Sequence, residues 1–258
     1  MSTLPPLLAA SDVHERRHVV IWLALTFAAG AVNAAALAAC QRFVTHVTGT
    51  LTRVGADFGE PTLMLEYACV LVSFVLGAMT SVMLIDGRRM RGLAASPVAP
   101  LVLVALVLVG VVIAGHAGVF GAFGAAVETP GDFLLLCVLA FAMGLQNASV
   151  ATTTGMIVRT THMTGPVTDF SIGLATMLSP GPEPIVEAAR RSVVLRGSKI
   201  FAFFAGCLVA SLLASQLGYA TFLLPAAAVG AAAALLRQRM SSPLRAFAPT
   251  VNTNLGRT

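Results

Sequence analysis

Long apolar stretches alternate with short polar ones along most of the chain. A helix that crosses a bilayer needs about 20 mostly apolar residues, at a rise of about 1.5 Å each. Six stretches meet this requirement: 19–40, 62–85, 98–116, 131–151, 199–217 and 219–236. Only Gly218 and its neighbours separate the last two, so we expect those two to form a tight helical hairpin. The pattern predicts an all-α integral membrane protein with six transmembrane helices.

The composition supports a membrane protein and disfavours nucleic-acid binding. Of the 258 residues, 57% are hydrophobic and 10% are charged, whereas soluble domains usually carry roughly a quarter charged residues. The mean hydropathy is +0.87. The net charge of +5 is expected to report cytoplasmic loops, because no basic run is interleaved with aromatic residues. The lipid bilayer is therefore an expected partner, and nucleic acid is not.

The four cysteines predict neither a disulfide framework nor a metal centre. All of them lie in apolar stretches, without CxxC or Cys/His spacing: Cys40, Cys69, Cys137 and Cys207. Cysteines of this kind commonly act as small polarizable residues packed between helices. The chain also lacks a nucleophile–base pair, an HExxH motif and clustered carboxylates. We therefore expect no metal, no cofactor and no enzyme activity.

Basic residues gather in the segments that would share one face of the membrane. They are Arg16, Arg17, Arg88, Arg89, Arg91, Arg159, Arg190, Arg191, Arg196, Lys199, Arg237, Arg239 and Arg245. On the other face, the loop between the third and fourth stretches carries only Glu128 and Asp132 as charges, while Arg42 and Arg53 are exceptions. Because cytoplasmic loops are enriched in Lys and Arg, both termini are expected in the cytoplasm. The expected parts are an N-terminal tail (1–17), a single transmembrane domain (18–237) and a C-terminal tail (238–258).

One unusual phrase occurs twice, 116 positions apart: "THVTGTLT" begins at Thr45 and "THMTGPVT" begins at Thr161. A Gly-x-x-Asn sequence precedes each phrase, ending at Asn33 in the first case and at Asn147 in the second. In each half, two more apolar stretches follow. Each repeat therefore contains three spans, an odd number, so the halves must enter the membrane from opposite sides, as they do in many secondary transporters. The two inverted three-helix repeats cover about 18–116 and 131–237.

The repeated phrase is poorly suited to the middle of a helix. Thr, Gly and His have low helix propensity, and irregular backbone at membrane depth survives only where it is buried in protein or lines a wet cavity. We expect 43–58 and 159–178 each to be a break followed by a short helix that dips into the membrane. Thr48 or Thr164 would cap that helix. The amides at the two helix starts would then face a central pocket with partial positive charge.

Polar and small residues around the two phrases are the candidate contacts of a solute. They are Asn33, Thr45, His46, Thr48, Gly49, Asn147, Thr161, His162, Thr164 and Gly165. Packing is the open alternative, because small residues, Thr, Asn and His are also ordinary contacts between transmembrane helices. Two carboxylates, Asp169 and Glu66, are candidates for proton or ion coupling. The alternative for Asp169 is an interfacial ion pair with Arg159.

At these residues the chain resembles the YoaK-like family of bacterial multi-pass membrane proteins of unknown function. The most specific pieces are "GAVNA", "FVTHVTGT", "FAMGLQNA" and "THMTGPVTD", and the similarity runs from about Arg17 to Arg239. The family pattern commonly has Gly-x-x-Asp in the first helix and Thr-Gly-Asn at the first break. This chain has Asn33 and Thr50 at those positions, so a proton-coupling carboxylate is not carried over to it. The resemblance implies a polytopic protein of the bacterial inner membrane and supplies no substrate.

The leading hypothesis for function is a transporter or permease for an unknown small solute. It would rock its two halves around a central site between the THxTG segments, as the inverted repeat and the paired breaks suggest. A passive channel with a fixed filter is one alternative. A non-transporting membrane assembly or scaffold protein is another, because helix packing alone would use the same small residues. A chain of six helices is also compatible with a homodimer.

Overall fold

The computed structural model describes residues 4–124 and 129–241, and within these residues every regular element is helical. Glu128 and Arg245, which entered the charge pattern above, lie outside the described residues, as do most of the C-terminal tail and the first three residues of the N-terminal one. The helices are α1 (Ala10–Val13), α2 (Arg16–Cys40), α3 (Val47–Ala56), α4 (Pro61–Met90), α5 (Val98–His116), α6 (Pro130–Thr153), α7 (Thr164–Leu178), α8 (Glu183–Leu217), the 3-10 turn η1 (Gly218–Phe222) and α9 (Leu223–Ser241). The all-helical fold class predicted from the sequence is confirmed.

The apolar stretches of the sequence coincide with the long helices. The first five lie inside α2, α4, α5, α6 and α8, and the sixth begins in η1 and continues in α9. Five segments of the structure are long and apolar enough to cross a membrane: Arg16–Cys40, Pro61–Met90, Val98–His116, Pro130–Thr153 and Glu183–Arg239. The last of them contains both α8 and α9. This arrangement is that of a multi-pass membrane protein.

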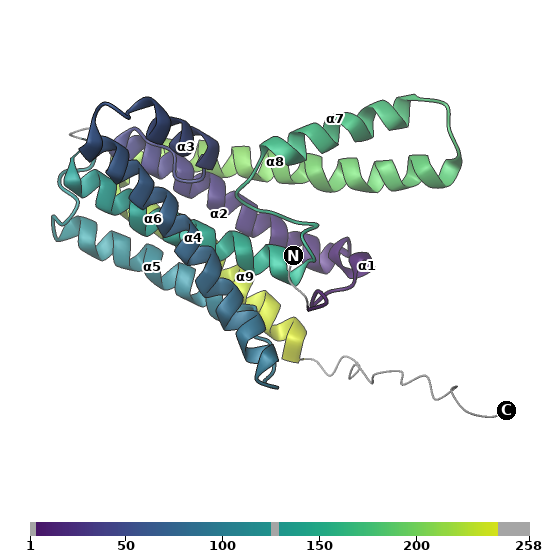
Figure 1. Cartoon of the computed structure of the whole chain (residues 1–258). Coiled ribbons are helices and arrows are strands. Elements are labelled where there is room, and N and C mark those ends of the chain that lie inside the picture. Colours follow the sequence, from purple (N-terminus) through teal and green to yellow (C-terminus); the bar gives the residue numbers. More distant parts are fainter. Residues whose placement is uncertain (1–3, 125–128, 242–258) are drawn as a thin grey trace.

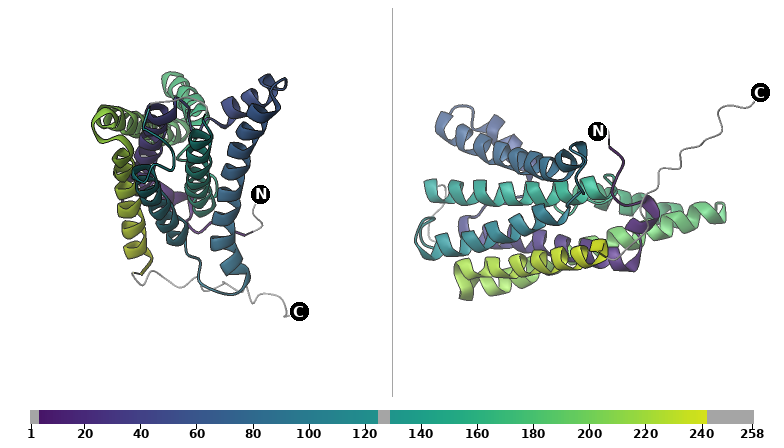
Figure 2. Two further views of the ribbon diagram at one scale, coloured as in Figure 1. Left: turned by 90° about the vertical axis from the view of Figure 1, so that its left-hand side faces the viewer. Right: turned by 90° about the horizontal axis from the view of Figure 1, so that it is seen from below.

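Two central helices, α2 and α6, form the interior of the bundle. Most of their residues are buried, including the large side chains of Trp22, Leu25, Leu139 and Met143. Helix α2 packs against α8 and α9, whereas α6 packs against α4 and α5, and α5 in turn packs against α9. Figures 1 and 2 show the long helices running side by side in this arrangement. The outer helices keep many apolar side chains exposed, as expected where a surface faces lipid.

The last two apolar helices do not form the expected tight hairpin. A short turn, η1, does connect α8 to α9, but α9 packs against α5 and α2 rather than along α8. The physical reason is that each helix has other packing partners: α8 packs on α2 and α7, and α9 packs on α5 and α2. The sequence shows the length of a connection, whereas the packing partner depends on which surfaces are small enough for close approach.

Glycines make the two closest helix crossings possible. A Cβ on Gly30 of α2 would overlap the carbonyl oxygen of Phe203 in α8, and a Cβ on Gly206 of α8 would overlap that of Phe27 in α2. The crossing of α4 and α6 repeats this reciprocal contact with another set of four residues: Gly77 with Phe141, and Gly144 with Phe74. Each glycine follows a phenylalanine by three residues in the sequence. The chain contains five Phe-x-x-Gly segments, and the four at these crossings interlock in two pairs.

Helix α7 and the first half of α8 pack against each other and project beyond one end of the bundle (Figures 1 and 2). Two glycines permit the close contact, because Gly173 faces Val193 and Gly197 faces Phe170. The same end of the molecule carries the starts of α1 and α2 and the ends of α4 and α9 (Figure 1). The short helix α3 lies against α4 at the other end.

The part of the N-terminal tail that the structure describes is folded onto this bundle. The Trp22 indole Nε1 donates to the carbonyl oxygen of Val13 at 3.3 Å, and the Leu8 amide donates to the carbonyl oxygen of Thr153 at 3.1 Å. The side chain of Val13 is fully buried. The tail is therefore attached to both central helices, α2 and the end of α6.

Candidate functional site

Each THxTG motif lies at the junction between a non-helical segment and a short helix. Helix α2 ends at Cys40, the next residue Gln41 adopts a left-handed conformation (φ 55°), and α3 begins at Val47. In the second half, α6 ends at Thr153, Met156 is left-handed (φ 70°), and α7 begins at Thr164. Both motifs therefore follow a residue in the left-handed conformation just beyond the end of a long helix.

The predicted threonine caps are wrong. His46 is the N-cap of α3 and Met163 is the N-cap of α7, and neither helix has a side-chain cap hydrogen bond. Thr48 and Thr164 are already inside their helices and are exposed. Their carbonyl oxygens accept hydrogen bonds from the side chains four residues on, Thr52 and Thr168. Thr48 is the second residue of α3 and Thr164 is the first residue of α7, whereas a capping side chain comes from the residue that precedes the helix.

The histidine and glycine of each motif form a local steric pair. An ideal Cβ on Gly49 would lie 2.5 Å from Nδ1 of His46, so the imidazole ring occupies the space that a side chain would need. In the second motif the Gly165 amide donates to Nε2 of His162 at 3.3 Å. That nitrogen accepts and so carries no proton in this arrangement. The spacing His-x-x-Gly is therefore explained by a ring that lies over the first turn of the helix.

Asn33 holds the first non-helical segment in place. Its Oδ1 accepts from the backbone amides of Val44 and Thr45, each at 3.0 Å, and its Nδ2 donates to Thr45 Oγ1 at 2.6 Å. These bonds occupy the side-chain amide of Asn33 within the protein. They satisfy the backbone N–H groups of Val44, which is buried, and of Thr45.

The corresponding non-helical segment of the second half, between α6 and α7, is held by different side-chain hydrogen bonds. Gln146 Nε2 donates to the carbonyl oxygen of Leu25 at 2.9 Å and to Thr160 Oγ1 at 3.1 Å. Within the described residues, the buried Oδ1 of the neighbouring Asn147 has no hydrogen-bond partner. Thr161 is buried at the same segment. Gln146 was not among the residues predicted from the sequence, because it lacks a counterpart in the first Gly-x-x-Asn motif.

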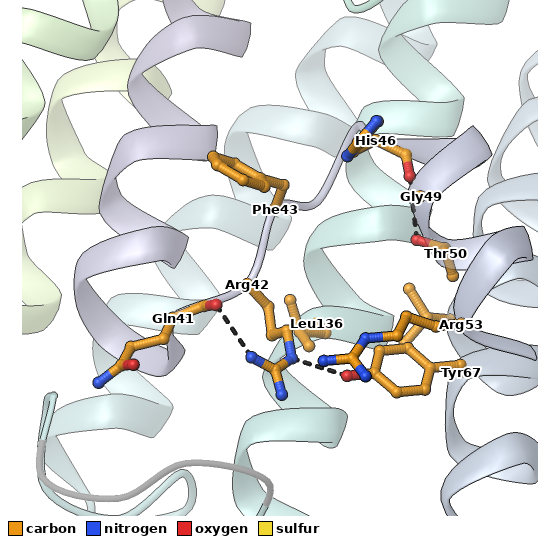
Figure 3. A pocket seen from close by; sticks show the side chains of 10 residues that line it. Gln41, Arg42, Phe43, His46, Gly49, Thr50, Arg53, Tyr67 and Leu136 are labelled. Atoms are coloured by element: carbon orange, nitrogen blue, oxygen red, sulfur yellow. Dashed lines mark hydrogen bonds between the residues drawn. The ribbon is translucent and has the colours of Figure 1, made fainter. Parts of the chain in front are cut away.

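A first cavity, here named the α3 cavity, has a volume of about 190 Å³. Its lining residues are Gln41, Arg42, Phe43, His46, Gly49, Thr50, Arg53, Tyr67, Val70 and Leu136. Figure 3 shows that both arginine side chains reach Tyr67. Arg42 Nε donates to the Tyr67 hydroxyl at 2.7 Å, and the Arg53 guanidinium lies 5.9 Å from the centre of the Tyr67 ring. Of the predicted site residues, His46 and Gly49 line this cavity.

A second cavity, here named the α7 cavity, has a volume of about 230 Å³. Its lining residues are Met156, Ile157, Arg159, His162, Gly165, Pro166, Asp169, Leu195, Arg196 and Lys199. Asp169 Oδ2 lies 3.0 Å from both Nε and Nη2 of Arg196. The ion pair considered from the sequence, Asp169 with Arg159, is therefore replaced by one with Arg196, because α7 packs along α8. The predicted residues in this cavity are His162, Gly165 and Asp169.

The two cavities share no lining residue, so each motif contributes to a cavity of its own. The remaining candidate for coupling, Glu66, is half-buried near the start of α4. Sequence reasoning used Arg42, Arg196 and Lys199 only as markers of orientation and did not consider Tyr67. The available signal was Lys199, an ionisable residue at the very start of an apolar stretch, since such residues are often functional.

Comparison with known proteins identifies a family. No curated protein and no solved structure matches the chain. The family model described as "Protein of unknown function (DUF1275)" matches residues 21–235, which is most of the chain and includes both THxTG motifs. This agrees with the resemblance to the YoaK-like proteins, which was noted on the same motifs. The chain belongs to this family of proteins of unknown function, DUF1275.

Proposed function

We propose that the protein is a multi-pass transporter for a small solute, without enzyme activity, and that its solute is handled at the two THxTG motifs. The observation that carries this proposal is the position of the motifs: each lies at the start of a short helix and lines a cavity with charged side chains. Broken or short helices beside polar cavities are how secondary transporters form their sites within an apolar bundle.

The contacts between helices support two halves of inverted topology. The first helix of each half crosses the second long helix of the other half, α2 with α8 and α6 with α4, through the same Phe-x-x-Gly contact. In the same way, α3 packs on α4 and α7 packs on α8. Counted from the crossing glycines, Tyr67 lies ten residues before Gly77, and Arg196 lies ten residues before Gly206. The α3 and α7 cavities thus use matching positions of the two halves.

The distribution of charge supports a cytoplasmic location for both termini, in the bacterial inner membrane that the resemblance implies. Arginines occur at the start of α2, at the end of α4 and in the last turn of α9, and these helix ends lie at the same end of the molecule (Figure 1). Lys and Arg are enriched on the cytoplasmic side of membrane proteins. In this orientation the α7 cavity opens near the cytoplasm and the α3 cavity near the opposite face.

Transport is tested by flux assays in proteoliposomes. We expect saturable uptake of one class among small anions, amino acids and sugars, which His46→Ala in the α3 cavity and His162→Ala in the α7 cavity each lower about tenfold or more. Gly110→Ala and Gly230→Ala are the matched controls, because nothing lies within 4 Å of a Cβ at either position. Sustained electrical current without saturation would indicate a channel instead. A folded protein that moves no solute of any class, in either direction, would favour an assembly or scaffold role.

A further inference from the structure

The α7 cavity contains more positive than negative charge. Three basic side chains line it, from Arg159, Arg196 and Lys199, and Asp169 is the acidic one. His162 also lines the cavity and cannot offset the positive charge, because an imidazole side chain carries no negative charge. One carboxylate is therefore shared among three cations, and that carboxylate is already used by Arg196 at 3.0 Å.

Lys199 is the residue whose position most needs a counter-charge. It lies on α8 and is only 3% exposed, although its side chain lines the cavity. Within residues 4–124 and 129–241, Lys199 makes no ion pair or hydrogen bond with a side chain. Burial of a lone ammonium is strongly unfavourable, so buried charges in proteins are almost always paired. Asp169 of the same cavity acts electrostatically on Lys199 but already pairs with Arg196, so a negatively charged solute would supply the counter-charge that the three basic side chains still lack.

The size and shape of the cavity select among anions. A volume of about 230 Å³ has room for a group of several heavy atoms. Arginine presents planar pairs of N–H donors that match carboxylate and phosphate oxygens, and lysine adds a point charge. Met156, Ile157 and Leu195 form the apolar part of the lining, which is suited to the short carbon chain or the ester of such an anion.

We propose that the α7 cavity binds an oxyanion, a phosphate or carboxylate group, held by Lys199 together with Arg159 and Arg196. This proposal names the solute class of the transporter proposed above. Its role in transport rests on that proposed function, whereas the binding of an oxyanion does not depend on it. The same phosphate chemistry is present in a free anion and in the headgroup of an anionic lipid, so the experiment has one arm for each source.

The first arm measures binding of soluble anions. The purified full chain in a neutral detergent is titrated with sodium phosphate and with sodium acetate at constant ionic strength set by sodium chloride, which contains no oxyanion. Binding is followed by calorimetry and by the unfolding temperature, which rises when a ligand binds only the folded state. Lys199→Met and Arg159→Gln should each weaken phosphate or acetate binding by about tenfold or more, as the loss of a charge-assisted hydrogen bond does.

Two further variants make this result specific. Lys199→Arg keeps the charge and should bind within a fewfold of the unmodified protein. Arg190→Gln also removes a positive charge from α8, but Arg190 is exposed and paired with Glu187, so binding should be unchanged. If Lys199→Met does not fold, Arg159→Gln still tests the cavity, because Arg159 is exposed in the segment between α6 and α7 and its replacement should not disturb folding.

The second arm places the protein in nanodiscs of phosphatidylcholine with or without phosphatidylglycerol. A rise in unfolding temperature caused only by phosphatidylglycerol, and lost in Lys199→Met, would assign the oxyanion to a lipid headgroup. A rise caused by soluble phosphate or acetate would assign it to a free anion. The proposal is overturned if no anion binds in either arm, or if anions bind equally well to Lys199→Met and Arg159→Gln. Anion binding without any flux would uphold the proposed anion site and refute transport. Flux of neutral solutes without anion binding would support transport and overturn the anion site.

Discussion

The histidine and glycine of each THxTG motif lie against each other, but the fit differs between the two copies. In the first copy the His46 ring occupies the position of a side chain at Gly49, with Nδ1 2.5 Å from an ideal Cβ. In the second copy the nearest atoms of His162 are 3.4 Å from an ideal Cβ on Gly165, an ordinary contact distance. The same pair of residues is therefore tight in one half and relaxed in the other.

This difference predicts that one mutation will act in only one of the two copies. In Gly49→Ala the new methyl group must displace the His46 ring from the α3 cavity, whereas Gly165→Ala can keep the ring of His162 where it is. Replacing a helical glycine with alanine gains about 0.5–1 kcal/mol of stability, which offsets a small shift of a flexible ring. We expect Gly49→Ala to reduce solute flux with little change in unfolding temperature, and Gly165→Ala to leave flux unchanged and the unfolding temperature equal or slightly higher. Equal loss of flux in both variants would contradict the steric explanation.

Asn33 offers a second prediction at this scale. Asn33→Ala would leave the amides of Val44 and Thr45 without their acceptor, which costs about 1–3 kcal/mol for buried groups. Asn33→Asp keeps an acceptor at the same place and should be much less destabilising; aspartate is also common there in the YoaK-like proteins that the chain resembles. Thermal unfolding in detergent measures both variants. Asn147→Ala is the comparison, and because its Oδ1 accepts no bond in the described structure, we expect a smaller loss.

At the scale of helices, the four interlocking Phe-x-x-Gly segments explain how closely α2 meets α8 and α4 meets α6. A Cβ at any of the four crossing glycines would overlap a carbonyl oxygen of the facing helix, and a backbone atom cannot move aside as a side chain can. The glycines therefore set the distance of the α2–α8 and α4–α6 crossings. Close backbone approach at small residues is the main source of specific helix packing in membranes.

The crossing glycines should be far more sensitive to alanine than glycines elsewhere in the bundle. Overpacking of a tight site costs about 1–3 kcal/mol or more, so Gly206→Ala and Gly144→Ala should lower the unfolding temperature clearly. Gly110→Ala in α5 and Gly230→Ala in α9 meet open space and should be neutral or slightly stabilising. Because Gly30 and Gly206 lie at one crossing, the double variant should cost less than the sum of the two single ones. Similar losses at all six positions would show that helix propensity, rather than the crossings, governs stability.

The sequence predicted the elements better than their contacts. Hydropathy located the apolar helices, and the α5 stretch, 98–116, agrees with the observed bounds. It could not reveal that α9 leaves α8 to pack on α5, because that depends on small residues facing each other across helices far apart in sequence. The four Phe-x-x-Gly segments were visible in the sequence, although only the glycines attracted notice.

The sequence predicted the candidate site only in part, again because it does not show which helices far apart in the chain come into contact. Repetition of THxTG located both cavities along the chain, whereas Tyr67, Arg196 and Lys199 join them from other helices through packing that a repeat does not encode. The predicted threonine caps were wrong because α3 and α7 begin before the threonines could cap them: the N-caps are His46 and Met163, and Thr48 and Thr164 already lie inside the helices. Asp169 forms an ion pair with Arg196 rather than with Arg159, because α7 packs along α8.

At the scale of the whole molecule, the proposed inverted topology predicts which face of the membrane each cavity serves. Three spans in each half would put α3 and α7 on opposite sides, and the positions of the basic helix ends would then place α7 on the cytoplasmic side. The segment Glu183–Arg239 is decisive, since it must cross the membrane twice for the second half to match the first.

Cysteine accessibility in intact cells tests this topology directly. In a background with the four native cysteines replaced, single cysteines are introduced at exposed positions: Thr52 in α3, Ser179 after α7 and Gln216 at the end of α8. A membrane-impermeant maleimide should label Thr52→Cys and Gln216→Cys from outside, and should label Ser179→Cys only after permeabilisation. Labelling of Gln216→Cys only after permeabilisation would mean that α8 does not cross the membrane. The second half would then lack its matching spans, and the α7 cavity would have no counterpart across the bilayer with which to exchange a solute.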